Sequence, residues 1–350
     1  MNIKYLKTRN FFLQDENLYS DRNSKKEKFL KAILYLDEHH RKNCKEYGMI
    51  TRLTKKNVKQ ISDLSFIPVD LFKKFNLASI RSKDIVKKLT SSGTSNNLSK
   101  IFLDRNNALA QSRVLQKILF KNFGNEKKPI IFLENLGVNE ENLSAKKAAI
   151  LGFSLLASKK YFPFNKSGKL NFNMINQIIS RHKNEEIIIF GFTYTVWNAF
   201  LNNSKIKGNL TNASIIHGGG WKKMENNKIS SENFKKKLIN KYRFKNIINY
   251  YGMIEQVGSI FFECKMGYFH TTSFSDILIR NRMLNKSSDK KTGLVQLLSI
   301  LPTSYPGHSI LTQDLGAVFG EDNCKCNLKG KYFKILGRAK KAEIRGCGNV

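Results

Sequence analysis

The sequence has no long apolar run, few cysteines and few acidic residues. Its longest near-apolar stretches, 148–157 and 187–197, are about half of the ~20 residues that a membrane-spanning helix requires, so we expect no transmembrane helix. The N-terminus lacks the apolar segment of a secretory signal, which predicts a cytoplasmic protein. In that reducing compartment the five cysteines are expected to be thiols, metal ligands or a nucleophile before they are disulfides.

The scarcity of acidic residues leaves a large positive charge. The chain has 27 Asp and Glu against 61 Lys and Arg, a formal net charge of +34, and such a balance is typical of nucleic-acid binding. However, the basic residues are spread along the whole chain, and Asn, Lys, Ile and Phe are abundant, as in proteins of AT-rich genomes. Compositional drift therefore accounts for much of the charge, and we predict no nucleic-acid partner.

The length of 350 residues and the hydrophobic content of 41% predict a globular protein of one large or two medium domains. Residues 1–80 mix charged and apolar positions at helical spacing, which predicts a helical N-terminal region. Residues 81–268 alternate short apolar runs with helix-like segments, which predicts an α/β core, and residues 269–336 are rich in strand and turn signals. Residues 337–350 form a short C-terminal stub, and we find no internal repeat.

The pattern predicts individual elements within these regions. The expected strands are 100–103, 130–133, 187–190, 215–216, 247–251, 275–280, 293–299 and 332–336. The expected helices are 106–123, 172–182 and 195–202.

A hydroxyl-rich loop between Leu89 and Lys100 is the most informative segment. It reads Thr-Ser-Ser-Gly-Thr-Ser after Leu89. Backbone N–H groups and hydroxyls around one glycine can converge on an anion, and Lys100 adds a charge for phosphate oxygens. The spacing is not that of the P-loop of NTPases, and an ordinary surface loop is the alternative.

Three further segments carry candidate binding residues. The strand at 215–216 runs into three glycines, Gly218–Gly220, on which a flat purine ring could lie; a flexible turn is the alternative. The strand at 247–251 ends in a glycine turn with Glu255 just beyond it, where a carboxylate could hold Mg²⁺. Asp314, placed at the end of a predicted strand, could take the ribose hydroxyls.

In this order and spacing the segments resemble the adenylate-forming superfamily. They are most similar to the acyl-protein synthetases of the bacterial bioluminescence fatty-acid reductase system and their phenylacetate-CoA-ligase-like relatives. The resemblance covers roughly residues 60 to 350. It implies an α/β fold, the large N-terminal domain of an adenylate-forming ligase, with layered α/β sheets, a small β-rich subdomain and no C-terminal cap domain.

The resemblance also implies the roles of individual residues. Those expected around the ATP phosphates are Ser91, Ser92, Gly93, Thr94, Ser95 and Lys100. Those expected beside the adenine are Gly218, Gly219, Gly220, Tyr251 and Gly252. Glu255 would bind Mg²⁺, Asp314 would hold the ribose, and Arg338 would approach the ribose or a phosphate.

The sequence departs from the family pattern at two places. Ile254 stands where the family usually has Thr, which removes a hydroxyl from the phosphate site. The sequence ends twelve residues after Arg338, so we expect no cap domain. The acyl-protein synthetases, which this layout resembles, transfer the acyl group to a cysteine of their own near the C-terminus. The resemblance implies that this cysteine is Cys347.

The surroundings of Cys347 suit a nucleophile. Lys340, Lys341 and Arg345 precede it, and neighbouring positive charge favours the thiolate form. The alternative is an incidental thiol in the C-terminal tail.

The other cysteines indicate a separate feature. Cys264 and His270, followed by Cys324 and Cys326, supply the soft ligands that structural zinc prefers. The Cys-x-Cys pair is tighter than the usual zinc spacing and lies far from Cys264, so reduced thiols in a turn are the alternative. Cys44, in the helical region, is expected to be a plain thiol.

The acyl-binding side is the least defined. Residues 187–197 pair a buried strand with an aromatic helix start, whose family counterpart lies near the carboxylate pocket; an ordinary core is the alternative. His217 could meet the carboxylate or bond a backbone carbonyl, and the sequence does not choose between them.

We therefore predict an ATP- and Mg²⁺-dependent acid–thiol ligase. It activates a carboxylic acid, expected to be a fatty acid, to an acyl-adenylate and passes the acyl group to Cys347 and then to a protein partner. The rival predictions are an acyl- or aryl-CoA ligase that uses coenzyme A, a basic nucleic-acid-binding protein, and an inactive scaffold. The sequence leaves open the acid, the final acceptor and the oligomeric state.

Overall fold

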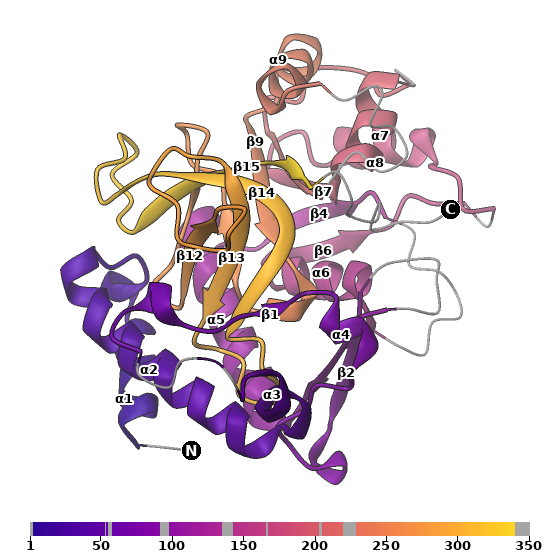
Figure 1. Cartoon of the computed structure of the whole chain (residues 1–350). Coiled ribbons are helices and arrows are strands. Elements are labelled where there is room, and N and C mark those ends of the chain that lie inside the picture. The colour runs from indigo at the N-terminus through magenta and orange to yellow at the C-terminus, as the bar shows by residue number, and fades with distance from the viewer. Residues whose placement is uncertain are drawn as a thin grey trace. The chain divides into compact units, whose positions relative to one another are not determined.

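The computed structural model describes residues 3–52, 54, 58–91, 98–134, 143–165, 167–202, 205–219 and 229–339. These residues divide into two compact units (Figure 1). Unit 1 contains the described residues up to 91, those from 98 to 121 and those from 252 to 339, whereas unit 2 contains those from 122 to 251. Unit 1 is therefore assembled from both the early and the late parts of the chain, and unit 2 comes from the stretch between them.

Unit 1 contains the helices of the N-terminal region and the antiparallel strands of the last part of the chain. Its helices are α1 (Ile3–Phe12), α2 (Arg22–Asn43), α3 (Lys45–Ile50), α4 (Leu71–Lys74) and α5 (Arg105–Phe123), of which the last two residues fall in unit 2. Its short 3-10 turns are η1 (Asp15–Asn17), η2 (Ile61–Asp63), η3 (Ser82–Asp84) and η7 (Ile254–Gln256). Its strands are β1 (Ile67–Pro68), β2 (Lys87–Thr90), β3 (Lys100–Leu103), β10 (Ile260–Phe262), β11 (Phe269–His270), β12 (Ser275–Arg280), β13 (Gly293–Ser299), β14 (Ser309–Glu321) and β15 (Lys331–Arg338).

Unit 2 alternates strands and helices. Its strands are β4 (Lys128–Phe132), β5 (Leu143–Ser144), β6 (Ala157–Tyr161), β7 (Ile187–Phe192), β8 (Ala213–Gly218) and β9 (Asn246–Gly252, whose last residue counts with unit 1). Its helices are α6 (Ala145–Phe153), α7 (Phe172–Arg181), α8 (Thr193–Val196) and α9 (Ser231–Tyr242), with the 3-10 turn η4 (Ser154–Leu156) and the π-helical η5 (Trp197–Asn202).

The sheet of unit 2 is parallel and covered on both faces. Its strands lie in the order β9-β8-β7-β4-β6, and each described pairing between them is parallel. One face packs against α7, α8 and α9 through a cluster that includes Ile189, Ile215 and Phe234. On the other face Phe153 of α6 contacts Phe190, with ring centroids 4.5 Å apart. Burial on both faces explains the unbroken apolar run of β7, and the predicted α/β core is present.

The larger sheet of unit 1 is antiparallel, in the order β11-β15-β14-β13-β12, with β1 added parallel to β14. The N-terminal helices are tied to this part of the chain by polar contacts over long sequence separations. Tyr5 donates a hydrogen bond of 2.6 Å to the carbonyl of Ile300. Lys25 Nζ donates to the carbonyls of Thr272 and Ser275 at 3.0 and 2.6 Å.

The structure bears out most of the elements expected from the sequence. Strands β12 and β13 have the expected bounds, and α5 and α7 agree within one residue at each end. The segment expected as a helix over 195–202 instead divides into α8 and the wider π-turns of η5. No helix among the described residues is both long enough and apolar enough to cross a membrane.

Candidate functional site

The residues predicted to bind ATP divide between the two units. Ser91, Lys100, Gly252, Glu255, Asp314 and Arg338 belong to unit 1, and Gly218, Gly219 and Tyr251 belong to unit 2. Ser92, Gly93, Thr94, Ser95 and Gly220 lie outside the described residues.

The hydroxyl-rich loop connects two paired strands, and hydrogen bonds join the residues at its two ends. Strands β2 and β3 pair antiparallel, with Thr90 opposite Lys100. The backbone N–H of Ser91 donates to the carbonyl of Ser99 at 3.1 Å, and the N–H of Ser99 donates to Ser91 Oγ at 2.9 Å. These bonds fix both ends of the loop and place the Lys100 backbone at the first residue of β3.

Glu255 lies in the turn η7, three residues after Gly252, which ends β9. The sequence predicts an acidic residue just beyond this glycine. Glu255 is only 3% exposed, and η7 packs against β3, the strand that Lys100 begins. The side chain of Gln256 fixes the turn, because its Nε2 donates to the carbonyls of Leu297 and Gly307 at 3.1 and 2.8 Å. The buried carboxylate of Glu255 is thereby held in a turn that packs against β3, the strand that begins at Lys100.

A tyrosine and a glycine enclose the same turn. Burial raises the pKa of Tyr305, and the nearby Glu255 carboxylate adds to the rise. A Cβ atom on Gly307 would lie 2.7 Å from the backbone oxygen of Glu255, so only glycine lets the chain pass so close to η7. Ile254, the departure from the family pattern, is buried in this turn.

Asp314 and Arg338, both predicted to contact the ribose, are partners across two strands. They face each other in the β14–β15 register, and Arg338 Nε lies 3.5 Å from Asp314 Oδ1. Arg338 also donates to Gln313 Oε1 at 3.0 Å. The expectation that Asp314 ends a strand is wrong, because β14 continues to Glu321; the turn lies eight residues beyond Asp314, after Asp322.

Gly218, the last residue of β8, and Gly219, which follows it, are glycines for different structural reasons. A Cβ on Gly218 would lie 2.6 Å from the Tyr250 ring and 2.8 Å from the Tyr250 carbonyl oxygen. Close packing against β9 therefore accounts for Gly218. Gly219 has φ = +74°, a left-handed conformation that glycine adopts at low cost. Tyr251, the next residue of β9, is half-buried.

His217 is buried at the end of β8 as a neutral imidazole. Burial lowers its pKa to about 3, and the positive charge of Lys235 contributes in the same direction. Its Nδ1 lies 3.0 Å from the Thr193 hydroxyl, which itself lies 3.1 and 3.0 Å from the carbonyl oxygens of Gly218 and Gly219. His217 therefore bonds a hydroxyl and not a backbone carbonyl. Its Nε2 has no hydrogen-bond partner among the described residues.

Glu134 is a buried polar residue that the sequence prediction missed. Its Oε1 accepts hydrogen bonds from the N–H of Phe192 at 3.0 Å and the hydroxyl of Thr195 at 2.8 Å, and its Oε2 lies 3.6 Å from Lys146 Nζ. The signal was available, because Glu134 lies two residues after the end of β4, much as Glu255 lies three residues after the end of β9. Glu134 anchors the start of α8.

Glu134, Thr193 and His217 thus meet the same edge of the parallel sheet, at the carboxyl ends of β4, β7 and β8. In open α/β sheets this is the edge at which ligands bind. The segment 187–197 is expected either near the carboxylate pocket or in the core. Its strand β7 is buried throughout and belongs to the core, and the start of α8 follows at this edge of the sheet.

The two cysteine segments predicted to form a zinc site come together in unit 1. The ligand atoms of Cys264, His270, Cys324 and Cys326 all lie within 4.8 Å of one another. Burial, with Cys324 and Cys264 contributing, raises the pKa of Cys326 to about 12. Burial also acts to raise the pKa of Cys264, but hydrogen bonds, first from His270, lower it overall. Cys44 is buried elsewhere, at the junction of α2 and α3. Cys347, Lys340, Lys341 and Arg345 lie outside the described residues.

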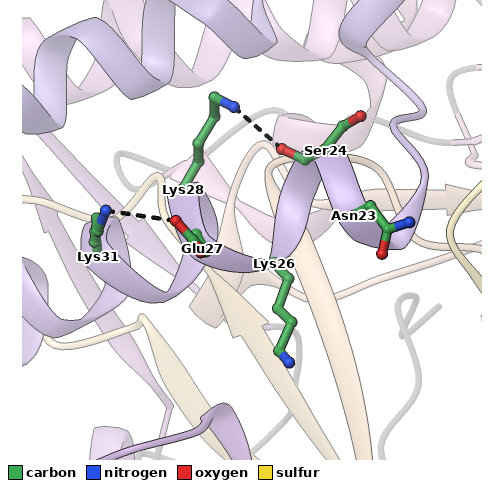
Figure 2. Close-up of a pocket in the computed structure, with 6 residues that line it drawn as sticks. All are labelled: Asn23, Ser24, Lys26, Glu27, Lys28 and Lys31. Carbon is green, nitrogen blue, oxygen red and sulfur yellow. Dashed lines mark hydrogen bonds and ion pairs between the residues drawn. The ribbon is translucent and has the colours of Figure 1, made fainter.

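A surface hollow on α2 does not belong to this chemistry (Figure 2). Its lining comes entirely from the outer face of that one helix: Asn23, Ser24, Lys26, Glu27, Lys28 and Lys31. Within it Lys31 pairs with Glu27 at 3.7 Å, and Lys28 reaches the Ser24 carbonyl at 3.5 Å. None of the residues predicted to bind ATP or the acid lines it.

Comparisons with known proteins identify the family that the sequence matches. The sequence model of the family "Acyl-protein synthetase, LuxE" matches residues 9–350. The long-chain-fatty-acid–luciferin-component ligase of Aliivibrio fischeri is 26% identical over 307 residues, which cover 84% of this chain and 79% of that protein.

Solved structures show the same fold. The chain is similar to 2-hydroxyisobutyryl-CoA ligase, an adenylate-forming enzyme, in complex with 2-HIB-AMP and CoA in the thioesterification state, with a TM-score of 0.71, 12% identity, and coverage of 92% of this chain and 70% of that one. For the open conformation the TM-score is 0.69 at 12% identity, with 93% and 77% coverage. The predicted fold class is therefore confirmed.

Proposed function

The chain belongs to the acyl-protein synthetase family, and from this premise we propose which of its residues carry each step. The enzyme is an acid–thiol ligase that activates an acyl group with ATP and transfers it. The curated relative is named for a long-chain fatty acid, and we infer that a long-chain fatty acid is also the substrate here.

In the first step a carboxylate oxygen attacks the α-phosphorus of ATP. The bond from that phosphorus to the oxygen bridging the β-phosphate breaks, and pyrophosphate leaves with that electron pair. Activation is needed because a carboxylate is a poor electrophile, whereas the acyl-adenylate carries AMP as a leaving group. The protein contributes positioning and charge neutralisation, which we assign to Lys100 and the hydroxyl loop of Ser91, Ser92, Gly93, Thr94 and Ser95.

The observation that carries this assignment is the buried Glu255 carboxylate in a turn packed against β3, the strand that begins at Lys100. Carboxylate oxygens are the ligands that Mg²⁺ prefers, so the residue present fits the metal that this chemistry needs. Mg²⁺ bound at Glu255 would neutralise charge on the phosphates. Both residues belong to unit 1.

The nucleoside part is assigned to the remaining residues. A carboxylate accepts several hydrogen bonds at once, so the ion pair of Asp314 with Arg338 is compatible with Asp314 binding the ribose hydroxyls. We assign the adenine to Gly219, Gly220, Tyr251 and Gly252, and Gly218 supports them by packing on Tyr250.

In the second step a thiolate attacks the carbonyl carbon of the acyl-adenylate. A carbon–sulfur bond forms, the bond from the carbonyl carbon to the AMP oxygen breaks, and AMP leaves. We assign the thiolate to Cys347, which follows Lys340, Lys341 and Arg345 in the sequence; the proton lost from the thiol passes to solvent. A partner protein then receives the acyl group. Coenzyme A is the competing acceptor, since it is bound in the solved relative.

ATP–pyrophosphate exchange tests the first step. We expect long-chain fatty acids to support exchange, and Glu255→Gln to lower it on the order of 10²-fold or more, because the amide keeps the shape but loses the charge. Glu38→Gln is the control, since Glu38 is exposed on α2 and pairs with Lys42; its exchange should equal that of wild type. Failure of every acid to support exchange, or a fully active Glu255→Gln, would refute the proposal.

Labelling with radioactive fatty acid and ATP tests the second step. We expect a hydroxylamine-sensitive label on the wild-type protein, which Cys347→Ser loses and Cys44→Ser retains. Cys44 is the matched control because it is a buried thiol without an assigned role. A labelled Cys347→Ser, or formation of acyl-CoA by an unlabelled wild type, would transfer the assignment to another thiol or to coenzyme A.

A further inference from the structure

Three thiols and one imidazole of unit 1 converge between two turns, and we propose that Cys264, His270, Cys324 and Cys326 bind one zinc ion that is structural. This site goes beyond acyl activation and transfer. No residue assigned to ATP or to the acyl group belongs to it, so the two proposals stand or fall separately.

The first turn joins β10 to β11. Cys264 N–H donates to the carbonyl of Tyr268, and Gly267 N–H donates to the carbonyl of Cys264, both at 2.8 Å. Gly267 has φ = +76°, which lets the chain reverse within four residues. This reversal brings His270, the second residue of β11, back beside Cys264.

The second turn joins β14 to β15. Asn327 N–H donates to the carbonyl of Cys324 at 2.9 Å, and Asn327 has φ = +71°. Leu328 N–H points at Cys326 Sγ, 3.4 Å away. The local backbone therefore turns tightly around the Cys-x-Cys pair and holds the two cysteines on one side of the turn.

The four ligand atoms are close enough together to bind one tetrahedral ion after small side-chain shifts. With Zn–S near 2.3 Å and Zn–N near 2.0 Å, tetrahedral geometry places ligand atoms about 3.5–3.8 Å apart. His270 Nε2 lies 3.3 Å from Cys326 Sγ, and no pair among the four exceeds 4.8 Å. An iron–sulfur cluster, which contains several metal atoms, would hold its ligands further apart.

Burial and charge also suit zinc. His270 and Cys324 are buried, and Cys264 and Cys326 are half-buried. Three thiolates around Zn²⁺ leave one net negative charge, and a lysine directly follows the first cysteine and another lies inside the Cys-x-Cys pair, Lys265 and Lys325. Soft sulfur ligands select zinc over Mg²⁺, so the site does not compete for the metal at Glu255.

The Cys-x-Cys pair lies in the turn of the β14–β15 hairpin, and Asp314 and Arg338 are the register pair furthest from that turn. Glu321 and Lys331 face each other at the turn end, seven residues along β14 from Asp314, which corresponds to about 23 Å. β11 pairs with β15 through only two residues, Phe269 and His270. A metal ion would therefore secure a weak edge strand, far from the nucleotide residues.

Metal analysis of the full chain tests the proposal. We expect purified wild type to hold one zinc per chain after gel filtration. Co²⁺ exchanged into the protein should give the intense visible bands of a tetrahedral thiolate site. Removal of zinc by a strong chelator should lower the Tm by several degrees, and added zinc should restore it. Exchange activity, measured well below that Tm with Mg²⁺ added back, should remain within about twofold of wild type.

Cys326→Ser is expected to lose the zinc and the Co²⁺ bands, whereas Cys44→Ser, the buried thiol outside the cluster, keeps both. If Cys326→Ser fails to fold, the wild-type zinc content and Co²⁺ spectrum still decide the question. A wild type that holds no zinc when purified with zinc present, a Cys324–Cys326 disulfide, or full zinc content in Cys326→Ser would overturn the site. Loss of exchange with zinc while the fold persists would overturn its structural role.

Discussion

His217 is buried as a neutral imidazole at the carboxyl end of β8, and this fixes how it responds to pH. Its pKa is about 3 in the folded protein, against 6.5 for the ordinary group. Between these values the unfolded chain binds a proton that the folded protein does not. The contribution of His217 to the unfolding free energy therefore decreases as the pH falls from about 6.5 towards 3.

We predict that His217→Asn removes this dependence. The Asn amide can replace Nδ1 as the partner of Thr193, but it does not titrate. Measured by urea unfolding, the advantage of wild type over the variant should shrink by about 2 kcal/mol from pH 7 to pH 5, since one pKa unit corresponds to about 1.4 kcal/mol. Parallel stability profiles of the two proteins over this range would contradict the assignment.

Single residues were predictable where the chemistry is local. The position of Glu255 after a glycine-ended strand follows from the order of strand, glycine and acid alone. The hydrogen-bond partner of His217 could not be predicted in this way, because Thr193 is 24 residues away and meets His217 only when β7 and β8 pair. Asp314 was misplaced because the glycine that follows it suggests a turn, whereas β14 continues through Gly316 with a register shift.

Among the elements, β8 and β9 are so close at Gly218 that a methyl group would not fit. The obstructing atoms include a backbone oxygen of Tyr250, 2.8 Å from the position of the added Cβ, and backbone in the middle of a sheet cannot move aside. At Gly252, the last residue of β9, the nearest atom would be 3.5 Å from an added Cβ, which is ordinary contact.

We therefore predict that Gly218→Ala lowers the unfolding free energy by about 2–3 kcal/mol. Gly252→Ala, the matched control on the neighbouring strand, should change it by less than about 1 kcal/mol. Urea denaturation of both variants checks the difference. Equal effects would mean that the two strands adjust to a side chain at Gly218.

Elements with a strong period were predictable from the sequence, and the exception has a physical reason. The run of β7 and the amphipathic α7 appear where the sequence placed them. The segment after Phe192 reads as one helix, but its first turn is fixed by Glu134, a residue 61 positions before Thr195, and it then widens into π-turns at Trp197. Tertiary contacts of this kind leave no periodic signal.

At the scale of the molecule, Lys25 links the beginning of the described chain to its last third. The residue is 5% exposed, and its ammonium group donates to the carbonyls of Thr272 and Ser275. Burial lowers its pKa, although Asp276 opposes the change. Lys26, the next residue of α2, is exposed and lines the surface hollow.

Lys25→Met is expected to lower the unfolding free energy by about 2–4 kcal/mol, because two buried carbonyls lose a charged donor. Lys26→Met should change it by no more than about 0.5 kcal/mol, and thermal or urea unfolding distinguishes the two. A pair of variants with equal stability would show that α2 is not held to this part of unit 1 through Lys25.

The class of the fold was predictable from the sequence, but the division of the chain into two units was not. Residues 1–80 and 269–336 read as separate regions because their textures differ, yet both contribute to unit 1. Contacts such as that of Tyr5 with Ile300 span 295 positions, and the spacing of apolar residues along the sequence does not predict them. For the same reason the spacing of Cys264 and Cys324 could suggest a metal set but could not show that the two turns meet.

The division of unit 1 between early and late residues has a consequence for the order of events during synthesis. A ribosome adds about 5–20 residues per second, so roughly 10–50 s pass between the emergence of Ser91 and that of Arg338. The described part of unit 2 has emerged once Tyr251 is added, before β12 to β15 are made. The nascent N-terminal helices meanwhile lack the strands that bury their apolar faces, and they are the segment on which a chaperone would act.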